Sequence, residues 1–509
     1  MIVKALDAWR NILSTENVLT DTATVSAAQT ATFATKQRVL ALIRPGNRAE
    51  VQECVRIANE YQTPIYPISC GKNWGLGSRV PVQDNCVILD LSRLNQIVDY
   101  NEKLAYITVE PGVTFRQAYD YLCEQKSNLF LSVIGGSPDA SLIGNTLERG
   151  DGFGPHGDRL DHVCELEVIL PTGECIHGGF GRFANAKAAK ISRWGVGPYF
   201  DGIFTQSNLG IVTRMTMWLM PIPKYPQIFT CTLIDASRLD KLIDTLQSLV
   251  LQGTIKSNSF VLWNCYKTLA AEGRYPWKIM SDKTPLSLKR LKGAEPWFGN
   301  GALYSASREQ GLAEQKLIEQ ALEGKVDQLI FSDEDSNELK GNKFIGVPSD
   351  QNIPSTYWRK KTPISSPMNP DRDGCGVIWL CPVLPFDGEQ LLLAIKIIES
   401  IFNSYHFEPN LGLGFPSGRS INVFIAIMYD RDVAGEDQRA MECHDEILHS
   451  LTKEGYIPYR LGIQSMNSLP STQDDYGKLI STLKRGLDPN NILAPGRYDF
   501  RNDWFDTSY

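Results

Sequence analysis

The sequence predicts an α+β protein with more than one domain. Two observations support this fold class. Helix and strand patterns alternate through the first half of the chain, and the prolines at 221 and 223 separate that half from a region with longer helical patterns. The chain has 509 residues, which agrees with several domains, because a single hydrophobic core stops growing beyond about 250–300 residues.

The composition excludes several classes of protein. Hydrophobic residues make up 42% and charged residues 21%, so the chain is not mainly disordered. The net charge is -7 without any run of Lys or Arg, so we expect no nucleic-acid partner. No apolar run approaches the ~20 residues of a membrane span, and we see no signal peptide. The 11 scattered cysteines form no C-x-x-C motif, which favours free thiols in a reducing compartment. We therefore expect a cytoplasmic protein with no membrane partner.

Capping signals and apolar periodicity predict the elements of the first half. Asn47-x-x-Glu50 and Thr114-x-x-Gln117 have capping-box spacing, and each precedes a helical pattern. Short apolar runs bounded by prolines or turns predict strands. These strands are expected at 65–68, 86–91, 106–110, 166–170 with 175–177 as a hairpin, and 211–220.

The second half follows a different pattern. Helices are expected from about 238, near 310–323, at 391–401 and at 437–451, with strands between them. Two stretches rich in turn formers lie at roughly 267–300 and 333–374. A tail helix at about 474–485 ends at Gly486. We infer three parts: residues 1–225, an α+β domain at 226–450 inserted into the chain, and a C-terminal segment at 451–509.

Two glycine-rich segments are the first features with chemical meaning. The segment 69–78 follows a strand, and its glycines allow several backbone N–H groups to converge on one anion such as a pyrophosphate. It matches neither the Rossmann nor the P-loop fingerprint, and a tight strand-to-helix connection is the alternative. The segment 134–158 suits backbone lying against a flat ligand, with a long surface loop as the alternative.

Several motifs in order resemble the vanillyl-alcohol oxidase and p-cresol methylhydroxylase flavoprotein family. They are G-K-N-W-G-L-G-S, V-E-P-G-V-T, G-N-T-L-E-R-G, H-G-D-R, F-T-Q-S-N-L-G-I-V-T and, near the end, P-N-N-I-L-A-P-G-R. The resemblance covers roughly 35–225 and 440–500 well, and the middle loosely. It implies a PCMH-type FAD-binding domain of two α+β subdomains, a core at about 35–225, and an inserted α+β cap domain that holds the substrate.

The resemblance also implies which residues bind FAD. The 69–78 loop would hold the pyrophosphate, the second glycine segment would line the flavin, and Ile211 with Val212 would touch the nucleotide. Arg497 would be a cationic partner of the cofactor, with a salt bridge at the end of a helix as the alternative. The implied set is Ile68, Ser69, Cys70, Gly71, Lys72, Asn73, Leu76, Gly77, Pro111, Gly144, Asn145, Arg149, Gly150, Gly152, Phe153, Gly157, Gly210, Ile211, Val212 and Arg497.

Family members hold a phenol as its phenolate with two tyrosines and an arginine, and a hydride then leaves the benzylic carbon for the flavin. The segment E-G-Y-I-P-Y-R matches and gives Tyr459 and Arg460, which can face one ligand only if the chain bends near Pro458. A pair on a surface hairpin is the alternative. The second tyrosine is replaced by Leu76, which removes one donor, worth about 1.5–3 kcal/mol toward a charged acceptor.

An acid and a histidine complete the expected catalytic set. Asp158 aligns with the family's carboxylate beside the flavin, and a surface pair with Arg159 is the alternative. His156 replaces a family tyrosine, and we expect it near the flavin as a proton shuttle titrating near neutral pH.

The residues that tether flavin in other members are missing. No His or Tyr occurs between 363 and 382, the family's position falls near Met368 and Asn369, and Cys375 is the one nucleophile nearby. We expect non-covalent FAD. No metal is expected either, since the histidines show no ligand spacing.

The sequence therefore predicts an FAD-dependent oxidoreductase that removes a hydride from a phenolic, benzylic or related alcohol-type small molecule. A 2-hydroxy-acid or sugar oxidoreductase, with Arg460 binding a carboxylate, is the first alternative; a non-catalytic flavin- or ligand-binding protein is the second. Oxygen or an electron-transfer protein would reoxidise the flavin, and the family implies a homodimer. The aromatic residues expected to form a substrate slot are Tyr275, Trp277, Trp297 and Phe298.

Overall fold

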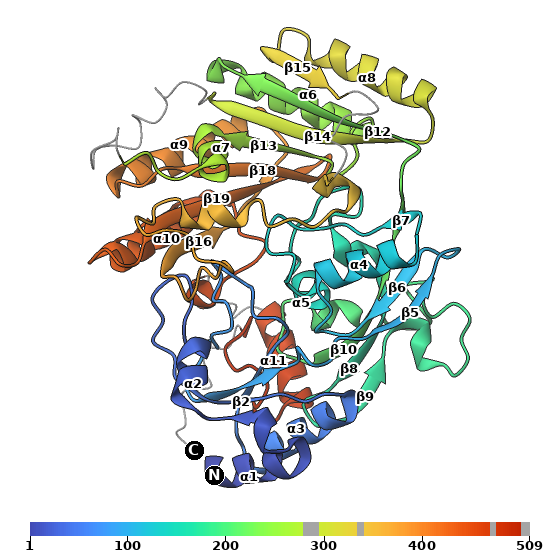
Figure 1. Ribbon diagram of the computed structural model, residues 1–509, viewed down its shortest axis with the longest axis vertical. Coiled ribbons are helices and arrows are strands. Elements are labelled where there is room, and N and C mark those ends of the chain that lie inside the picture. The colour runs from blue at the N-terminus through green and yellow to red at the C-terminus, as the bar shows by residue number, and fades with distance from the viewer. Residues whose placement is uncertain (278–294, 333–340, 469–474, 500–509) are drawn as a thin grey trace.

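The computed structural model describes residues 1–277, 295–332, 341–468 and 475–499. Two smaller sheets, built from strands between residues 18 and 218, lie together below one large sheet built from residues 225–430 (Figure 1). The chain combines helices with separate, mostly antiparallel sheets, so the predicted α+β class is confirmed. Of the two turn-rich stretches expected from the sequence, residues 278–294 and 333–340 lie outside the described part of the chain.

The first sheet carries the strand that precedes the glycine-rich loop. Its order is β1-β2-β4-β3, with β2, β4 and β3 parallel and β1 antiparallel to β2. Asn47 caps α3 by accepting a hydrogen bond from the Glu50 N–H, as the capping box predicts. The strands are β1 (Val18–Leu19), β2 (Val39–Ile43), β3 (Ile65–Ile68) and β4 (Cys86–Asp90), and the helices α1 (Ile2–Leu13), α2 (Thr22–Ala28) and α3 (Arg48–Glu60).

The second sheet is antiparallel and has the order β5-β6-β10-β8-β9. The predicted hairpin is confirmed as β8 and β9, and Thr114 caps α4 as expected. The strand expected at 211–220 ends at Trp218, because residues 220–221 form a separate pair with 129–130. The elements are β5 (Ile97–Asn101), β6 (Tyr106–Val109), α4 (Phe115–Glu124), β7 (Leu129–Phe130), α5 (Leu142–Leu147), β8 (Val163–Ile169), β9 (Cys175–His177), β10 (Ile211–Trp218) and β11 (Met220–Pro221).

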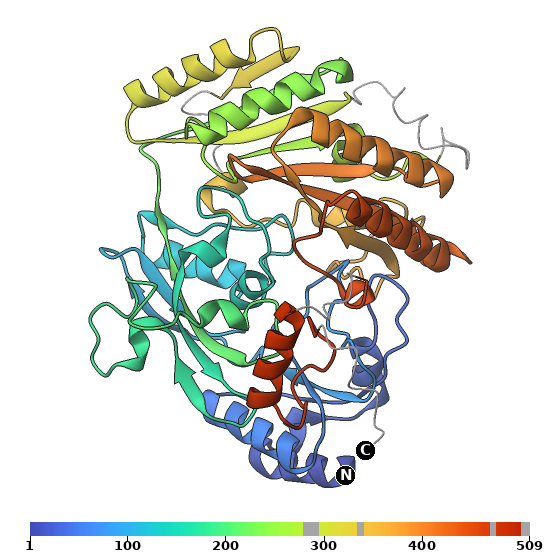
Figure 2. The same ribbon diagram turned by 180° about the vertical axis from the view of Figure 1, so that it is seen from behind.

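The large sheet forms the cap over the two smaller ones. Its order is β15-β12-β14-β13-β18-β19-β16, and β17 also pairs with β19. The helices α6, α8, α9 and α10 lie side by side across one face of this sheet (Figure 2). The strands are β12 (Tyr225–Leu233), β13 (Phe260–Asn264), β14 (Trp297–Ser305), β15 (Gln328–Phe331), β16 (Cys375–Leu380), β17 (Val383–Pro385), β18 (Asn410–Ser417) and β19 (Ser420–Asp430). The helices are α6 (Leu239–Leu251), α7 (Cys265–Glu272), α8 (Arg308–Leu322), α9 (Gly388–Ser404) and α10 (Glu436–Lys453).

The end of the chain returns to the first sheet. After α11 (Asp475–Leu487), the Ala494 N–H donates to the Ile65 carbonyl and the Ile65 N–H donates to the Ile492 carbonyl, both at 2.8 Å. Ile492 and Leu493 are buried in the core beneath this sheet. The C-terminal segment therefore lies beside the strand that leads into the glycine-rich loop (Figure 1).

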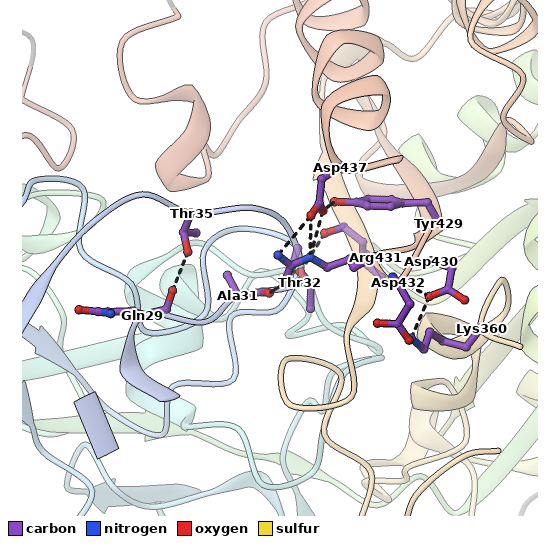
Figure 3. A network of polar contacts seen from close by, with 12 residues as sticks. Gln29, Ala31, Thr32, Thr35, Lys360, Tyr429, Asp430, Arg431, Asp432 and Asp437 are labelled. Carbon is purple, nitrogen blue, oxygen red and sulfur yellow. Dashed lines mark hydrogen bonds and ion pairs between the residues drawn. The ribbon is translucent and has the colours of Figure 1, made fainter. Parts of the chain in front are cut away.

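A polar network fixes the cap to the N-terminal part (Figure 3). Arg431 of the cap donates to the Ala31 carbonyl at 2.7 Å and is held by Asp437. Thr32 exchanges two bonds with Val377 of β16, and its hydroxyl also accepts from the Gly75 N–H at 2.8 Å. The cap is thus joined directly to the glycine-rich loop, which sets the shape of the space between them.

Within the part of the chain that the structure describes, no helix is both long and apolar enough to cross a bilayer.

Candidate functional site

Two adjoining cavities meet at the glycine-rich loop, one between the first two sheets and one below the cap. The first, here the loop cavity, has a volume of about 190 Å³ and follows residues 66–73, 140–148, 204–212 and 493–497. The second, here the cap cavity, has a volume of about 290 Å³ and lies between residues 134–153 and the cap strands. The residues that line both are Lys72, Asn73, Leu76, Ala140, Asn145 and Arg460.

The loop cavity is built to bind an anion. The backbone N–H groups of residues 69–73 donate to no other group in the described chain, and Gly71 has a φ of +64°, which turns the backbone back on itself. Lys72 adds a positive charge from the same loop. An ordered set of free N–H groups beside a cation is a suitable cradle for a phosphate or pyrophosphate.

Arg497 lies at the other side of the loop cavity. Its guanidinium pairs with Glu148 at 2.5 Å and donates to the Tyr66 hydroxyl at 2.8 Å. From the sequence, Arg497 was either a cationic partner of the cofactor or part of a salt bridge. In the structure it forms an ion pair and also faces the cavity. Ile211 and Val212 at the start of β10 supply an apolar wall. This combination of anion cradle, arginine and apolar wall fits a dinucleotide such as FAD.

Tyr459 and Arg460 both reach the cap cavity, and Arg460 also reaches the loop cavity. The expected bend is confirmed: Pro458 bridges Pro382, and the chain bends at the two following residues. Burial raises the pKa of Tyr459 well above its usual range, while the neighbouring Arg460 opposes that rise. The Nε of Arg460 is buried and has no hydrogen-bond partner among the described residues. A buried, partly unsatisfied guanidinium facing a cavity is suited to binding an anionic oxygen.

Asp151 is the carboxylate that lines the cap cavity. With the Asn258 amide in its satisfied orientation, the Nδ2 of that residue donates to Oδ1 at 3.1 Å, and Asn422 donates to Oδ2 at 3.5 Å. Burial raises the pKa of Asp151 to about 6, although the Gly152 N–H, which donates to the same side chain, acts in the other direction. A carboxyl with such a pKa can both accept and release a proton near neutral pH. The sequence reasoning missed this residue, although an acid between two glycines of the segment was a usable signal.

Asp158 and His156 lie in neither cavity. Asp158 is exposed and precedes the 3₁₀ helix Arg159–His162. His156 stacks on His162 with ring centres 3.6 Å apart, and burial together with that neighbour lowers its pKa to about 4. The expectation that His156 titrates near neutral pH is therefore wrong. Arg159 does not form the surface pair with Asp158 that was the alternative, since Arg159 is buried and donates to Ser132 and to the Gly150 carbonyl.

The structure divides the expected cofactor residues among three places. Those in the loop cavity are Ile68, Ser69, Cys70, Gly71, Lys72, Asn73, Leu76, Gly144, Asn145, Gly210, Ile211, Val212 and Arg497. Those confined to the cap cavity are Gly150, Gly152 and Phe153. Those in neither are Gly77, Pro111, Arg149 and Gly157. Gly77 has another reason to be glycine, because a Cβ there would lie 2.7 Å from the side chain of Ile463.

Cys375 is fully buried and lines neither cavity, and burial raises its thiol pKa to about 12. Met368 and Asn369, at the family's tether position, also lie outside both cavities. The aromatic residues of the cap cavity also differ from those expected. Tyr275, Trp277, Trp297 and Phe298 are absent from its lining, which is formed instead by Trp74, Phe153, Phe260, Trp263, Trp379 and Phe424.

One group of metal-ligand type occurs among the described residues, formed by Glu167, Cys175 and His177. Arg48 and Arg214 lie 3.2 and 3.4 Å from the same Glu167 oxygen. Two cations therefore already neutralise this carboxylate, and the expectation of no metal stays a prediction.

Comparison with known proteins agrees with this geometry. A family model described as an FAD binding domain matches residues 39–179. The chain is 46% identical to the 1'-carboxy-chondrochloren decarboxylase of Chondromyces crocatus, over 98% of both chains. It is 31% identical to the 4-cresol dehydrogenase [hydroxylating] flavoprotein subunit of Pseudomonas putida, over 89% of this chain and 87% of the relative.

The three-dimensional fold is also similar to that of a solved structure. The crystal structure of p-cresol methylhydroxylase with substrate bound superposes with a TM-score of 0.90 at 30% identity, covering 98% of this chain and 96% of the other. The similarity therefore includes the cap and the C-terminal segment as well as the FAD-binding part. This chain belongs to the vanillyl-alcohol oxidase and p-cresol methylhydroxylase flavoprotein family and is an FAD-dependent oxidoreductase.

Proposed function

We propose that this enzyme oxidises a 4-hydroxyphenyl compound at its benzylic carbon. The observation that carries the proposal is that Tyr459 and Arg460 face a cavity that adjoins the loop cavity. Bound FAD supplies a two-electron acceptor for the hydride. The residues of the chain hold the substrate, and they exclude water by burying it between the cap and the FAD-binding part.

In this proposal the substrate binds as a phenolate. The Tyr459 hydroxyl and the Arg460 guanidinium donate to its oxygen, and Asn73 orients Arg460 by accepting from Nη2 at 3.0 Å. A stabilised phenolate places electron density on the carbon para to the oxygen, which favours departure of hydride from the attached carbon. Leu76 supplies no donor, so Arg460 carries more of the stabilisation than it would beside a second tyrosine.

We assign proton handling to Asp151 in place of Asp158. Once the hydride has left, the product is a quinone methide, which accepts a nucleophile such as water at the former benzylic carbon. The attacking water must release a proton, and Asp151 is the acid of the cap cavity whose raised pKa suits it to accept that proton.

A second candidate is oxidation with loss of carbon dioxide. The relative from Chondromyces crocatus is a decarboxylase, and its name places a carboxyl group on its substrate. The charged lining of the cap cavity favours such a substrate here, since Lys72, Lys267 and Arg460 face it and Asp151 is the single acid among its described lining residues. In 3-(4-hydroxyphenyl)propanoate, hydride loss from the benzylic carbon would give the quinone methide. Cleavage of the bond to the carboxylate would then form the new C=C bond, release CO2 and restore the phenolate.

We also propose non-covalent FAD, because the described residues that line the two cavities include no histidine, and their two tyrosines, Tyr66 and Tyr459, lie outside the family's tether region. The division into 1–225, 226–450 and 451–509 is our proposal as well; the separate sheets support it. A cytoplasmic location is supported by the free state of all eleven cysteines. The homodimer and the identity of the acceptor, oxygen or an electron-transfer protein, rest on family likeness.

Anaerobic mixing tests the proposed function. Protein reconstituted with FAD is mixed with 4-ethylphenol while the flavin absorbance is followed, and 4-ethylanisole, which cannot ionise, is the matched control. We expect bleaching with the phenol alone, and a rate constant lowered about 10- to 100-fold in Tyr459→Phe, as for the loss of one charged hydrogen bond. Bleaching by 2-hydroxy acids but by no phenol would contradict the proposal. Formation of 4-vinylphenol and CO2 from 3-(4-hydroxyphenyl)propanoate would favour the second candidate.

A further inference from the structure

Lys267 lies inside the cap cavity, in the first turn of α7. Asn264 caps this helix by accepting from the Lys267 N–H at 3.1 Å. The same Asn264 side chain accepts from the Leu411 N–H at 3.1 Å and donates to the Pro409 carbonyl at 2.6 Å. The backbone of Lys267 is therefore fixed to the beginning of β18.

The Lys267 side chain is also confined along its length. A Cβ on Gly412 would lie 2.7 Å from Cε and 2.8 Å from Cδ, so the lysine stem lies directly against the backbone of Gly412. The ammonium lies 4.9 Å from the ring centre of Trp379 and 5.4 Å from that of Trp263. The charge is thus held over two aromatic rings that line the cavity.

In the described part of the chain, no carboxylate pairs with this charge. Among the described residues, the Lys267 ammonium has no ion-pair or hydrogen-bond partner. A second lysine, Lys343, lies close by in the 3₁₀ helix Lys343–Ile345, 5.6 Å from the Trp263 ring centre and 4.7 Å from that of Phe153. Lys343 likewise has no acidic partner in the described chain.

Such an arrangement is unfavourable without an anion. Burial lowers the pKa of both lysines to about 8, and Lys343 contributes to the effect on Lys267. A cation in the first turn of a helix also opposes the helix dipole. A bound carboxylate would offset the free-energy cost of burying two positive charges without a counter-charge.

We propose that Lys267, with Lys343 beside it, binds a carboxylate of the substrate and selects aryl-alkanoic acids over neutral alkylphenols. The inference rests on the proposed phenol oxidation, with the phenol bound at Tyr459 and Arg460 and the acid bound at Lys267. The two anionic groups of one substrate then bind to two separate cationic groups of the same cavity. Lys267 is a specificity residue in this scheme and takes no part in hydride removal.

Kinetics of the FAD-reconstituted enzyme test the assignment with two substrates. These are 3-(4-hydroxyphenyl)propanoate, which carries the carboxylate, and 4-ethylphenol, which lacks it. The variants are Lys267→Met, which keeps the length but removes the charge, Lys267→Arg, which restores a charge, and Lys256→Met, an exposed cap lysine, as the matched control. We expect Lys267→Met to raise KM for the acid at least tenfold and to change kcat/KM for 4-ethylphenol less than twofold. Lys267→Arg should recover part of the loss, and Lys256→Met should match the wild type.

A binding measurement separates this inference from the proposed function. 3-Phenylpropanoate has the acid but no phenol, so its dissociation constant reports the carboxylate site whether or not phenols are oxidised. We expect Lys267→Met to weaken its binding at least tenfold in calorimetric titration. An unchanged dissociation constant, or an equal loss for the acid and for 4-ethylphenol, would overturn the carboxylate site. A wild type that binds 3-phenylpropanoate through Lys267 but is not bleached by any phenol would overturn only the proposed phenol oxidation.

Discussion

The Nη2 of Arg460 donates to the Oδ1 of Asn73 at 3.0 Å, across 387 positions of sequence. Asn73 belongs to the glycine-rich loop, Arg460 follows the bend after Pro458, and both line the loop cavity and the cap cavity. This bond therefore fixes the arginine at the boundary between the two cavities, which is where the proposed reaction holds the phenolate for hydride transfer.

Replacement of Arg460 by Met should lower kcat/KM for 4-ethylphenol by roughly 10- to 150-fold, the loss of a hydrogen bond to a charged group. Arg460→Lys should recover little, because a lysine lacks the forked guanidinium that reaches both Asn73 and the substrate. Steady-state kinetics measure both. Arg419→Lys, in the exposed turn between β18 and β19, is the control. An Arg460→Met enzyme with wild-type kcat/KM would remove this arginine from the site.

Asp151→Asn should lower turnover about 100-fold or more, within the range typical of general acid–base groups. With the pKa of Asp151 at about 6, the wild-type rate should fall as the pH drops below 6, and the variant should lack this dependence. Asp158→Asn should change the rate less than threefold, because that side chain lies in neither cavity. A pH–rate profile of the three proteins checks this. A greater loss in Asp158→Asn than in Asp151→Asn would restore the assignment made from the sequence.

The carboxyl of Asp151 should also make the free energy of unfolding depend on pH. Its pKa is raised from 3.8 to about 6 in the folded state, so the folded protein binds the proton more tightly than the unfolded chain. Stability should therefore be lost as the pH rises from about 4 to 6. Asp151→Asn should avoid that loss and gain up to about 3 kcal/mol above pH 6, at 1.36 kcal/mol per pKa unit. Thermal melts of the apo-proteins at pH 4.5 and 7.5 measure it. If the Tm difference between variant and wild type is the same at both pH values, the Asp151 carboxyl does not cause the pH dependence.

Arg497→Met should weaken FAD binding at least tenfold. The change removes a cation from the loop cavity and leaves Glu148, its partner at 2.5 Å, without a counter-charge. Adding Glu148→Gln should restore part of the affinity by removing that uncompensated charge. Quenching of flavin fluorescence gives the dissociation constants. If the double variant binds FAD more weakly than Arg497→Met does, Glu148 contacts the cofactor favourably and the account is wrong.

Cys375→Ser should keep wild-type flavin content and release all colour on acid precipitation, since this thiol is buried away from both cavities. The visible spectrum of the supernatant checks it. Colour that stays in the wild-type pellet but not in the Cys375→Ser pellet would establish a thioether at this position.

Local signals of the sequence were sufficient for much of the fold. Asn47 and Thr114 cap the helices that their spacing predicts, and the β8–β9 hairpin forms around its turn. The glycine-rich loop was also recognisable, because residues that bring N–H groups together are adjacent in the chain. The resemblance to a family gave Tyr459, Arg460 and Arg497, which the structure places in the two cavities.

The sequence by itself determined the fold class, the family, the glycine-rich loop and the pair at 459–460, because each depends on short-range order or on motifs that occupy consecutive positions. Only the tertiary structure showed which acid lines the cap cavity, since Asp151 and Asp158 lie in the same segment and differ in the direction that the folded loop gives them. It also decided that Lys267, on a cap helix, lies in the same cavity as Arg460. Burial and the absence of a counter-charge arise from contacts between distant segments, and no local pattern encodes them.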